Sequence, residues 1–191
     1  GSADSERESW LLALEPVLVR AYMLSSPNGQ EQLALQQQLE ILVGGNPDRA
    51  LTLGTQLKLR NRNALALIWV NLAVKNGGVW PEDKRDRNLV LAYTLQGQLS
   101  MQAGLIQESL AAFQNAVALD ADHFPAQFEL SDLLVRLGRL SEARVPTQRA
   151  LELFDQAGVA PEMAVAVRGT LESHLSRIEA ADAMGPSAPP K

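Results

Sequence analysis

Residues 104–119 (GLIQESLAAFQNAVAL) and residues 138–153 (GRLSEARVPTQRALEL) can be superimposed at an interval of 34 residues. The matching or equally small positions are Gly104 with Gly138, Ser109 with Ala143, Ala116 with Ala150 and Leu119 with Leu153. A period of about 34 is typical of helix–turn–helix repeats, whose units bury their apolar faces only by stacking on one another. The interval therefore predicts a solenoid of helix pairs, and with it a binding scaffold rather than an enzyme.

The composition agrees with a folded, helical protein. The chain has 191 residues, of which 46% are hydrophobic and 20% charged, which is ordinary globular usage and enough for one domain or one continuous helical array. Aromatic residues are only 5% of the chain, and the abundance of Ala, Leu and Gln favours helices over strands. We predict an all-α fold.

The net charge and the hydropathy of the chain limit the classes of partner that we expect. The formal net charge is −5, so the field of the protein repels a phosphate backbone, and we do not expect nucleic acid as the main partner. The sequence contains no run of 18 apolar residues, so we predict no membrane span, and we recognise no signal peptide in it. The opening Gly1-Ser2 resembles the remnant of a cleaved tag, so we expect a segment excised from a longer protein.

The chain contains no cysteine, which excludes disulfides, thiolate nucleophiles and cysteine metal sites. This composition suits an oxidising bacterial periplasm, although cytoplasmic proteins of this length can also lack cysteine. The sequence therefore leaves the location open between the periplasm and the cytoplasm. We expect no cofactor.

Apolar periodicity and turn residues divide the first half of the chain. We predict a helix over 5–24 interrupted at Pro16, a turn at 25–29, and a helix over 30–43 that ends at Gly44-Gly45. Asn46-Pro47 predicts the start of the next helix, and another follows over 63–76. Because Gly45 and Ala50 have the same five-residue spacing as Gly104 and Ser109, we interpret this half as two degenerate helix pairs.

The second half is more regular. Helices are predicted over 88–103, 106–119, 124–137 and 140–155, with a glycine at each bend that tolerates the left-handed conformation of a helix C-terminus. The predicted organisation is an N-terminal helix and turn over 1–29, degenerate pairs and a charged loop over 30–87, two clear repeats over 88–157, a capping helix over 158–183 and a flexible tail over 184–191.

These residues resemble the tetratricopeptide repeat (TPR) family, whose pattern has glycine at repeat positions 8 and 15, a small residue at 20, an aromatic at 24 and alanine at 27. One repeat supplies Gly97, Gly104, Ser109, Phe113 and Ala116, and the next supplies Gly138, Ala143 and Ala150. Ser131 and Thr147 depart from the pattern at positions 8 and 24 of the second repeat, and Ala121 stands where proline is usual. The resemblance implies antiparallel helix pairs wound into a right-handed superhelix.

The resemblance also implies a peptide or protein ligand, held on a concave groove that the first helix of each pair lines. Transferred by register, the groove residues are Thr94, Gln98, Met101, Gln102, Phe128, Asp132, Val135 and Arg136, with Asn71 and Lys75 added by a looser alignment. The alternative is that the polar residues belong to solvated helix faces and that Met101 and Phe128 belong to the core between repeats.

Two further segments have a polar or chemically suggestive composition. The Asp120, Asp122 and His123 cluster has the residue types of a metal site, but a polar turn between repeats explains it better, and neither histidine lies in a recognisable hydrolase motif. The charged stretch 79–87 (VWPEDKRDR) predicts a solvated loop, and its alternative is a partner contact through an exposed Trp80.

The sequence thus supports a non-catalytic interaction scaffold, a segment of a larger bacterial assembly, export or biogenesis protein. The alternative is a small TPR chaperone that keeps an export substrate unfolded. Self-association is left open by the sequence.

Overall fold

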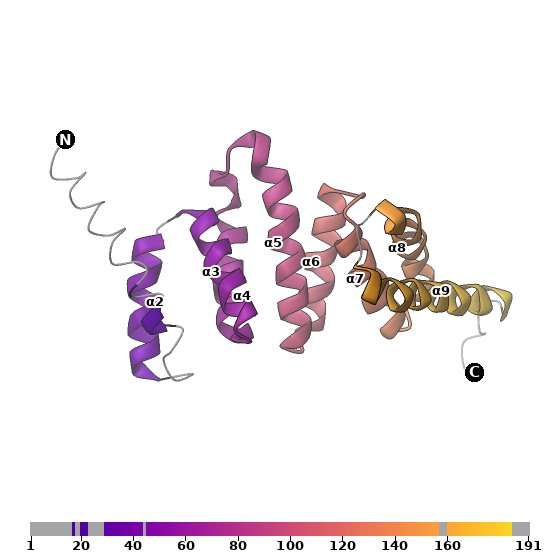
Figure 1. The fold of residues 1–191 in the computed structure, drawn as a ribbon, viewed down its shortest axis with the longest axis horizontal. Helices are drawn as coiled ribbons and strands as arrows, with labels where there is room; N and C mark the ends of the chain where they lie inside the picture. Colours follow the sequence, from indigo (N-terminus) through magenta and orange to yellow (C-terminus); the bar gives the residue numbers. More distant parts are fainter. Residues whose placement is uncertain (1–16, 18–19, 23–28, 44, 157–159, 185–191) are drawn as a thin grey trace, which may run out of the picture. The chain divides into compact units, whose positions relative to one another are not determined.

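The computed structural model describes residues 17, 20–22, 29–43, 45–156 and 160–184 (Figure 1). The described residues form helices joined by short connections and contain no strand, which confirms the all-α prediction. Most of the predicted helix over 5–24, with Pro16, and most of the predicted tail over 184–191 lie outside the described residues. The chain divides into two compact units, Gly1–Arg85 and Asp86–Lys191.

The first unit is built around the pair α3 (Pro47–Leu59) and α4 (Asn63–Lys75), preceded by α2 (Gln30–Val43). The start of α3 is as predicted, since the Asn46 side chain accepts hydrogen bonds from the backbone N–H groups of Asp48 (3.0 Å) and Arg49 (3.2 Å). Pro47 occupies the first turn, where it costs no hydrogen bond. The predicted bounds of α2 and α4 and the predicted start of α3 agree with the structure within one residue.

The bend of this pair lies at Asn61, which corrects the predicted register. Asn61 has φ 57°, and the next residue, Arg62, donates its N–H to the Leu57 carbonyl (2.9 Å), which closes a Schellman turn. Gly45 is not a bend of this kind, because its φ is not positive. Gly54 lies seven residues before the bend and Ala66 five residues after it, so the pair has the repeat spacing of Gly97, Gly104 and Ser109.

The prediction of a charged loop over 79–87 is wrong. A short 3-10 helix, η1 (Gly77–Val79), is followed by Trp80 and Pro81, and α5 (Glu82–Gln102) then begins. The Pro81 carbonyl accepts the N–H groups of Lys84 (3.0 Å) and Arg85 (2.8 Å), and Glu82 and Asp83 lie in the first turn, where negative charge is favourable. The alternating charges therefore belong to a solvated helix start.

In the second unit, α5 continues into α6 (Ile106–Leu119), α7 (Phe124–Arg136) and α8 (Leu140–Leu153). The last three lie within two residues of the predicted bounds, whereas α5 begins six residues before the predicted start at residue 88. Gly104 and Gly138 bend the chain between helices with φ +75° and +72°. Each bend is a Schellman turn: Leu105 donates to the Ser100 carbonyl and Arg139 to the Leu134 carbonyl, both at 2.9 Å. The two glycines thus occupy equivalent positions, as the 34-residue interval predicts.

Positions 8 and 24 of each repeat touch one another across the pair. A Cβ atom built on Gly54 would lie 2.7 Å from Val70 Cγ2, and one on Gly97 would lie 2.5 Å from the Phe113 ring. In the remaining pair these positions are Ser131 and Thr147, whose hydroxyl oxygens lie 2.7 Å apart in the buried interior. One register therefore describes all three helix pairs.

The last helix, α9 (Pro161–Met184), follows the 3-10 helix η2 (Phe154–Gln156) and packs on α8 and α7. Its buried stripe contains Leu171, His174 and Ile178, spaced three and four residues apart, as a helix laid on an apolar surface requires. Glu172 and Arg177, which replace the repeat glycine and small residue, are exposed.

Candidate protein-interaction site

The first helices of the two pairs in the second unit are α5 and α7. Besides Val135, they carry seven of the predicted groove residues. These are Thr94, Gln98, Met101 and Gln102 on α5, and Phe128, Asp132 and Arg136 on α7. We call the side of these two helices that carries repeat positions 5, 9, 12 and 13 the first-helix face. The structure places the seven residues in different surroundings.

Three of them, with Val135, belong to the interior. Thr94 is 7% exposed, and its hydroxyl donates to the Val90 carbonyl of its own helix (2.7 Å). Met101 packs against the core cluster around Leu110 and Phe113, and Phe128 packs against the cluster that contains Phe154. The Thr94 hydroxyl is therefore not free to bind a ligand in the predicted groove. Met101 and Phe128 belong to the core, as the alternative interpretation proposed, and so does Val135, which is 1% exposed.

The polar residues of the face have defined partners. Gln98 Nε2 donates to Glu129 Oε1 (2.8 Å), which links α5 to α7. Arg136 Nε lies 2.7 Å from Asp132 Oδ2, and the Arg136 side chain is 67% exposed. Gln102 is exposed at the end of α5. The accessible functional groups of the face are thus the Gln102 amide and the Arg136 guanidinium, beside the half-buried Gln98 and Asp132.

Asp132 is held in its ionised form. Burial raises the pKa of this carboxyl, but hydrogen bonding from His174 and Arg136, together with their positive charge, more than offsets burial and leaves the pKa below its ordinary value. Each oxygen has its own partner, because Oδ2 faces Arg136 and Oδ1 lies 3.5 Å from His174 Nε2. A negative charge is therefore fixed under the first-helix face.

A buried polar cluster beneath Asp132 escaped the sequence analysis. Ser131 Oγ lies 2.7 Å from Thr147 Oγ1 and 3.1 Å from His174 Nδ1. Serine, histidine and aspartate thus lie together as in a hydrolase, but Ser131 is 0% exposed, so no substrate reaches its hydroxyl. A signal existed in the sequence, because Ser131 and Thr147 are both departures from the repeat pattern at two positions that touch in a repeat of this kind.

Asn71 and Lys75 do not lie on a first helix, which corrects their assignment. Both are exposed residues of α4, the second helix of the α3–α4 pair. The register set by Asn61 instead gives Leu51, Thr55 and Lys58 of α3 as the equivalents of Thr94, Gln98 and Met101. The looser alignment failed because it took Gly45 as the bend.

The expectation of an exposed Trp80 is also wrong. The side chain is 3% exposed, and its indole N–H donates to Asp48 Oδ1 at 2.8 Å. Trp80 therefore ties the connection after α4 to the first turn of α3. A partner contact through this indole is not supported by the structure.

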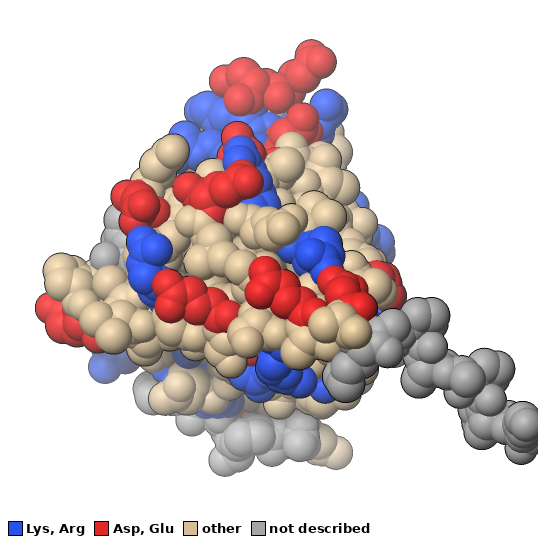
Figure 2. Space-filling model, turned by 90° about the vertical axis from the view of Figure 1, so that its right-hand side faces the viewer, with Lys and Arg blue, Asp and Glu red and all other residues tan. Residues whose placement is uncertain are grey.

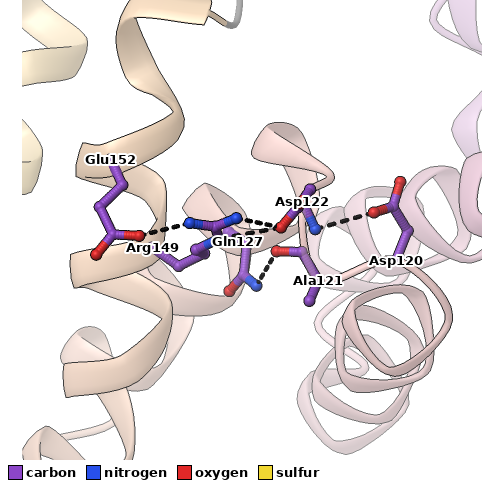
Figure 3. Close-up of polar contacts among 6 residues, drawn as sticks. All are labelled: Asp120, Ala121, Asp122, Gln127, Arg149 and Glu152. Atoms are coloured by element: carbon purple, nitrogen blue, oxygen red, sulfur yellow. Dashed lines mark hydrogen bonds and ion pairs between the residues drawn. The ribbon is translucent and has the colours of Figure 1, made fainter.

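The acidic cluster between α6 and α7 forms a turn (Figure 3). Asp120 Oδ1 accepts the N–H of Asp122 (2.9 Å), and Gln127 Nε2 donates to the Ala121 carbonyl (2.7 Å). Arg149 of α8 pairs with Asp122 and with Glu152. Within the described residues, no group of three or more His, Cys, Asp or Glu side chains is placed to hold a metal ion.

His123 opens onto a cavity of about 520 Å³ in the second unit. The cavity is lined by Asp86, Arg87, Val90 and Leu91 of α5 and by Leu119, Asp120 and His123. Burial lowers the pKa of His123, and the nearby Asp120 only partly offsets this, so the imidazole is neutral at pH 7. The lining combines both charge signs with exposed leucines.

The surface offers no field of one sign on the side drawn in Figure 2, where acidic and basic side chains alternate over the visible face. None of the helices in the described part of the chain is long and apolar enough to cross a membrane.

Comparison with known proteins identifies a fold. No family model matches the sequence, and no curated protein matches it either. Among solved structures, one described as the crystal structure of MamA protein is similar, with 14% identity and a TM-score of 0.57 over 98% of this chain and 100% of that chain. Together with the three bends of equal register, this likeness shows that the chain has a TPR-like helical repeat fold.

Proposed function

We propose that this protein is a non-catalytic interaction scaffold that holds a peptide or protein partner on its first-helix face. In its finer form the proposal makes the chain a segment of a larger bacterial assembly, export or biogenesis protein. The TPR-like fold supports a protein partner, because stacked helix pairs present a rigid, repeated surface.

One observation carries the proposal: Gln98 of α5 and Arg136 of α7, two polar side chains of the first-helix face, are held by contacts that the fold itself supplies. Gln98 is oriented by Glu129 of the neighbouring repeat, and Arg136 is oriented by Asp132. A surface whose side chains are already ordered loses less conformational entropy when it binds a ligand. Gln102 and Arg136 are the exposed donors that such a ligand would meet first.

The first test is site-specific photo-crosslinking in an extract of the source cells. A photoreactive amino acid replaces Gln102 or Arg136 on the first-helix face, and, as matched controls, Gln114 of α6 or Gln148 of α8, which are exposed on the second helices. We expect a discrete crosslinked partner from the first-helix positions and at most a few per cent of that yield from the controls, because a crosslink needs direct contact.

Equal or greater crosslinking from Gln114 or Gln148 would contradict the assignment and move the binding surface to the second helices. A crosslink to a second copy of this chain would identify self-association as the use of the face. All four substituted positions are exposed, so far-ultraviolet circular dichroism is expected to show the same helix content for the four variants.

A further inference from the structure

The cavity of about 520 Å³ beside His123, which we call the His123 pocket, is formed by two separate parts of the second unit. One wall is the beginning of α5, with Asp86, Arg87 and Leu91, and the other is the end of α6 and the turn before α7, with Asp120 and His123. The volume lies within the range of roughly 300–1,000 Å³ that is usual for sites of small ligands. The pocket is therefore large enough to admit a complete side chain of another molecule.

The apolar part of the pocket comes from side chains on both walls. Leu91 of α5 is 46% exposed and Leu119 of α6 is 41% exposed, and both line the pocket together with the buried Val90. A single exposed leucine on a protein surface needs no explanation, but two leucines from different helices that line one cavity provide an apolar surface for a ligand. The ligand that fits them has an aliphatic part that covers these side chains.

The polar part of the pocket has an excess of negative charge. The lining contains two carboxylates, Asp86 and Asp120, and one guanidinium, Arg87. One oxygen of Asp120 accepts the N–H of Asp122, and the other points away from that contact (Figure 3). His123 adds no positive charge at pH 7, because burial lowers its pKa. A ligand with one positive charge would balance the lining.

The second unit as a whole favours the same kind of ligand. Residues 86–191 contain 13 Asp and Glu and 8 Lys and Arg, so this unit carries a net charge of −5, which equals that of the whole chain. A net negative charge favours the approach of a basic partner over that of an acidic one. Across the described part of the chain no three His, Cys, Asp or Glu side chains are placed to hold a metal ion, so the pocket is not a metal site. An organic cation with an aliphatic chain fits both parts of the lining.

The His123 pocket lies on the same side of α5 as the first-helix face. Arg87, Leu91, Gln98 and Gln102 are spaced by four, seven and four residues, which places their side chains along one side of the helix. At about 1.5 Å per residue, Leu91 and Gln102 are about 16 Å apart along the helix axis. An extended segment of about five residues spans this distance. A partner that lies on the first-helix face would thus reach the pocket.

We propose that the His123 pocket receives an arginine or lysine side chain of the protein partner, with its aliphatic stem on Leu91 and Leu119 and its charged end at Asp86 and Asp120. Arginine and lysine are the side chains that join an aliphatic stem to a positive charge. The proposal rests on the proposed function, because the side chain belongs to the partner held on the first-helix face.

Nuclear magnetic resonance of the intact chain tests the pocket without the cellular partner. The probe is N-acetyl-arginine amide, and its matched control is N-acetyl-citrulline amide, which has nearly the same shape but no charge. We expect the arginine probe to shift the ring signals of His123 saturably at millimolar concentration. The citrulline probe should bind at least about threefold more weakly, which is the usual effect of losing an exposed charge pair.

Three results of this comparison would overturn the proposal. The first is equal binding of the arginine and citrulline probes, and the second is the absence of a saturable shift at His123. The third is tighter binding of N-acetyl-glutamate amide than of the arginine probe, which would make Arg87 the centre of an anion site.

Two pairs of variants locate the bound probe. Asp120→Asn can keep the hydrogen bond from the Asp122 N–H but loses the charge, whereas the control Asp122→Asn removes the same charge from a residue that is paired with Arg149. Leu119→Ser removes an exposed leucine from the pocket, and the control Leu105→Ser removes one of equal exposure (41%) outside it. We expect Asp120→Asn and Leu119→Ser to weaken binding of the arginine probe about threefold or more, and both controls to bind as the wild type does. Equal effects of a variant and its control would contradict the assignment.

The pocket and the first-helix face can fail separately. Selective binding of the arginine probe without crosslinks from Gln102 or Arg136 would place the partner at the pocket and reject the face. Crosslinks from those two positions without selective binding of the probe would keep the face and reject the basic side chain. The comparison of the two probes uses the wild-type chain, so it decides the proposal even if a variant does not fold.

Discussion

At the residue scale, the fold depends on positions that admit no side chain. Gly97 lies against Phe113, and a Cβ atom on it would meet the ring at 2.5 Å, far inside normal contact. Gly169 of α9 is a glycine in a helix with nothing within 4 Å of the corresponding Cβ position. The two residues therefore form a matched pair for testing the repeat contact.

We predict that Gly97→Ala lowers the free energy of unfolding by about 1–3 kcal/mol, because overpacking at the Phe113 ring exceeds the gain in helix propensity. Gly169→Ala should be neutral or stabilising by up to about 1 kcal/mol. Urea unfolding followed by circular dichroism measures both. Equal effects of the two substitutions would show that the contact with Phe113 does not matter.

The three bends share one backbone conformation, although two have glycine and one has asparagine. Gly104, Gly138 and Asn61 all have positive φ. Since a left-handed conformation costs an L residue with a Cβ atom about 1–2 kcal/mol, we predict that Gly138→Ala destabilises the protein by that amount. Asn61→Gly should not destabilise it, and a large loss of thermal stability in Asn61→Gly would contradict the assignment of this bend.

At the element scale, Trp80 joins the connection after α4 to α3. Replacing it by Phe keeps most of the ring but removes the indole N–H that binds Asp48 Oδ1. We predict that Trp80→Phe costs about 1 kcal/mol, the usual net value of a hydrogen bond, whereas Trp80→Ala costs about 3–5 kcal/mol. Equilibrium unfolding of the two variants checks this, and an unaffected Trp80→Ala protein would show that the side chain is not structural.

The sequence predicts elements well where one local cause decides them. Gly104 and Gly138 predict their bends because glycine is the usual residue at positive φ, and Asn46-Pro47 predicts a helix start. Asn61 was missed because asparagine adopts the same conformation less often, and because the bends at Asn61 and Gly104 lie 43 residues apart rather than 34. The early start of α5 at Glu82 contributes to that longer spacing.

The candidate site was less predictable for a physical reason. Register indicates which helix face a residue lies on, but burial depends on the neighbouring repeat. Thr94 tolerates burial because its hydroxyl donates to the Val90 carbonyl of its own helix, and Trp80 tolerates it because its indole N–H donates to Asp48, 32 residues earlier. The meeting of Ser131 with His174 is a contact across 43 residues that no local pattern contains.

At the scale of the whole molecule, Asp132 couples stability to acid. The pKa of Asp132 is lower in the folded state than its ordinary value of 3.8. The ionised carboxylate therefore stabilises the protein at pH values above 3.8, and this stabilisation is lost as the pH falls through the lower pKa of the folded state. We predict that the free energy of unfolding of Asp132→Asn falls less steeply below about pH 4 than that of the wild type. Parallel pH profiles of the two proteins would contradict this.

The most direct test of the central claim is the affinity of the crosslinked partner for two double variants of the intact chain. We predict that Gln102→Ala with Arg136→Gln on the first-helix face weakens binding at least about tenfold, the usual effect of losing a central contact. The matched double variant Gln114→Ala with Gln148→Ala on the second helices should bind as the wild type does. Undiminished binding by the first variant, or weakened binding by the second, would show that the partner is not held where this account places it.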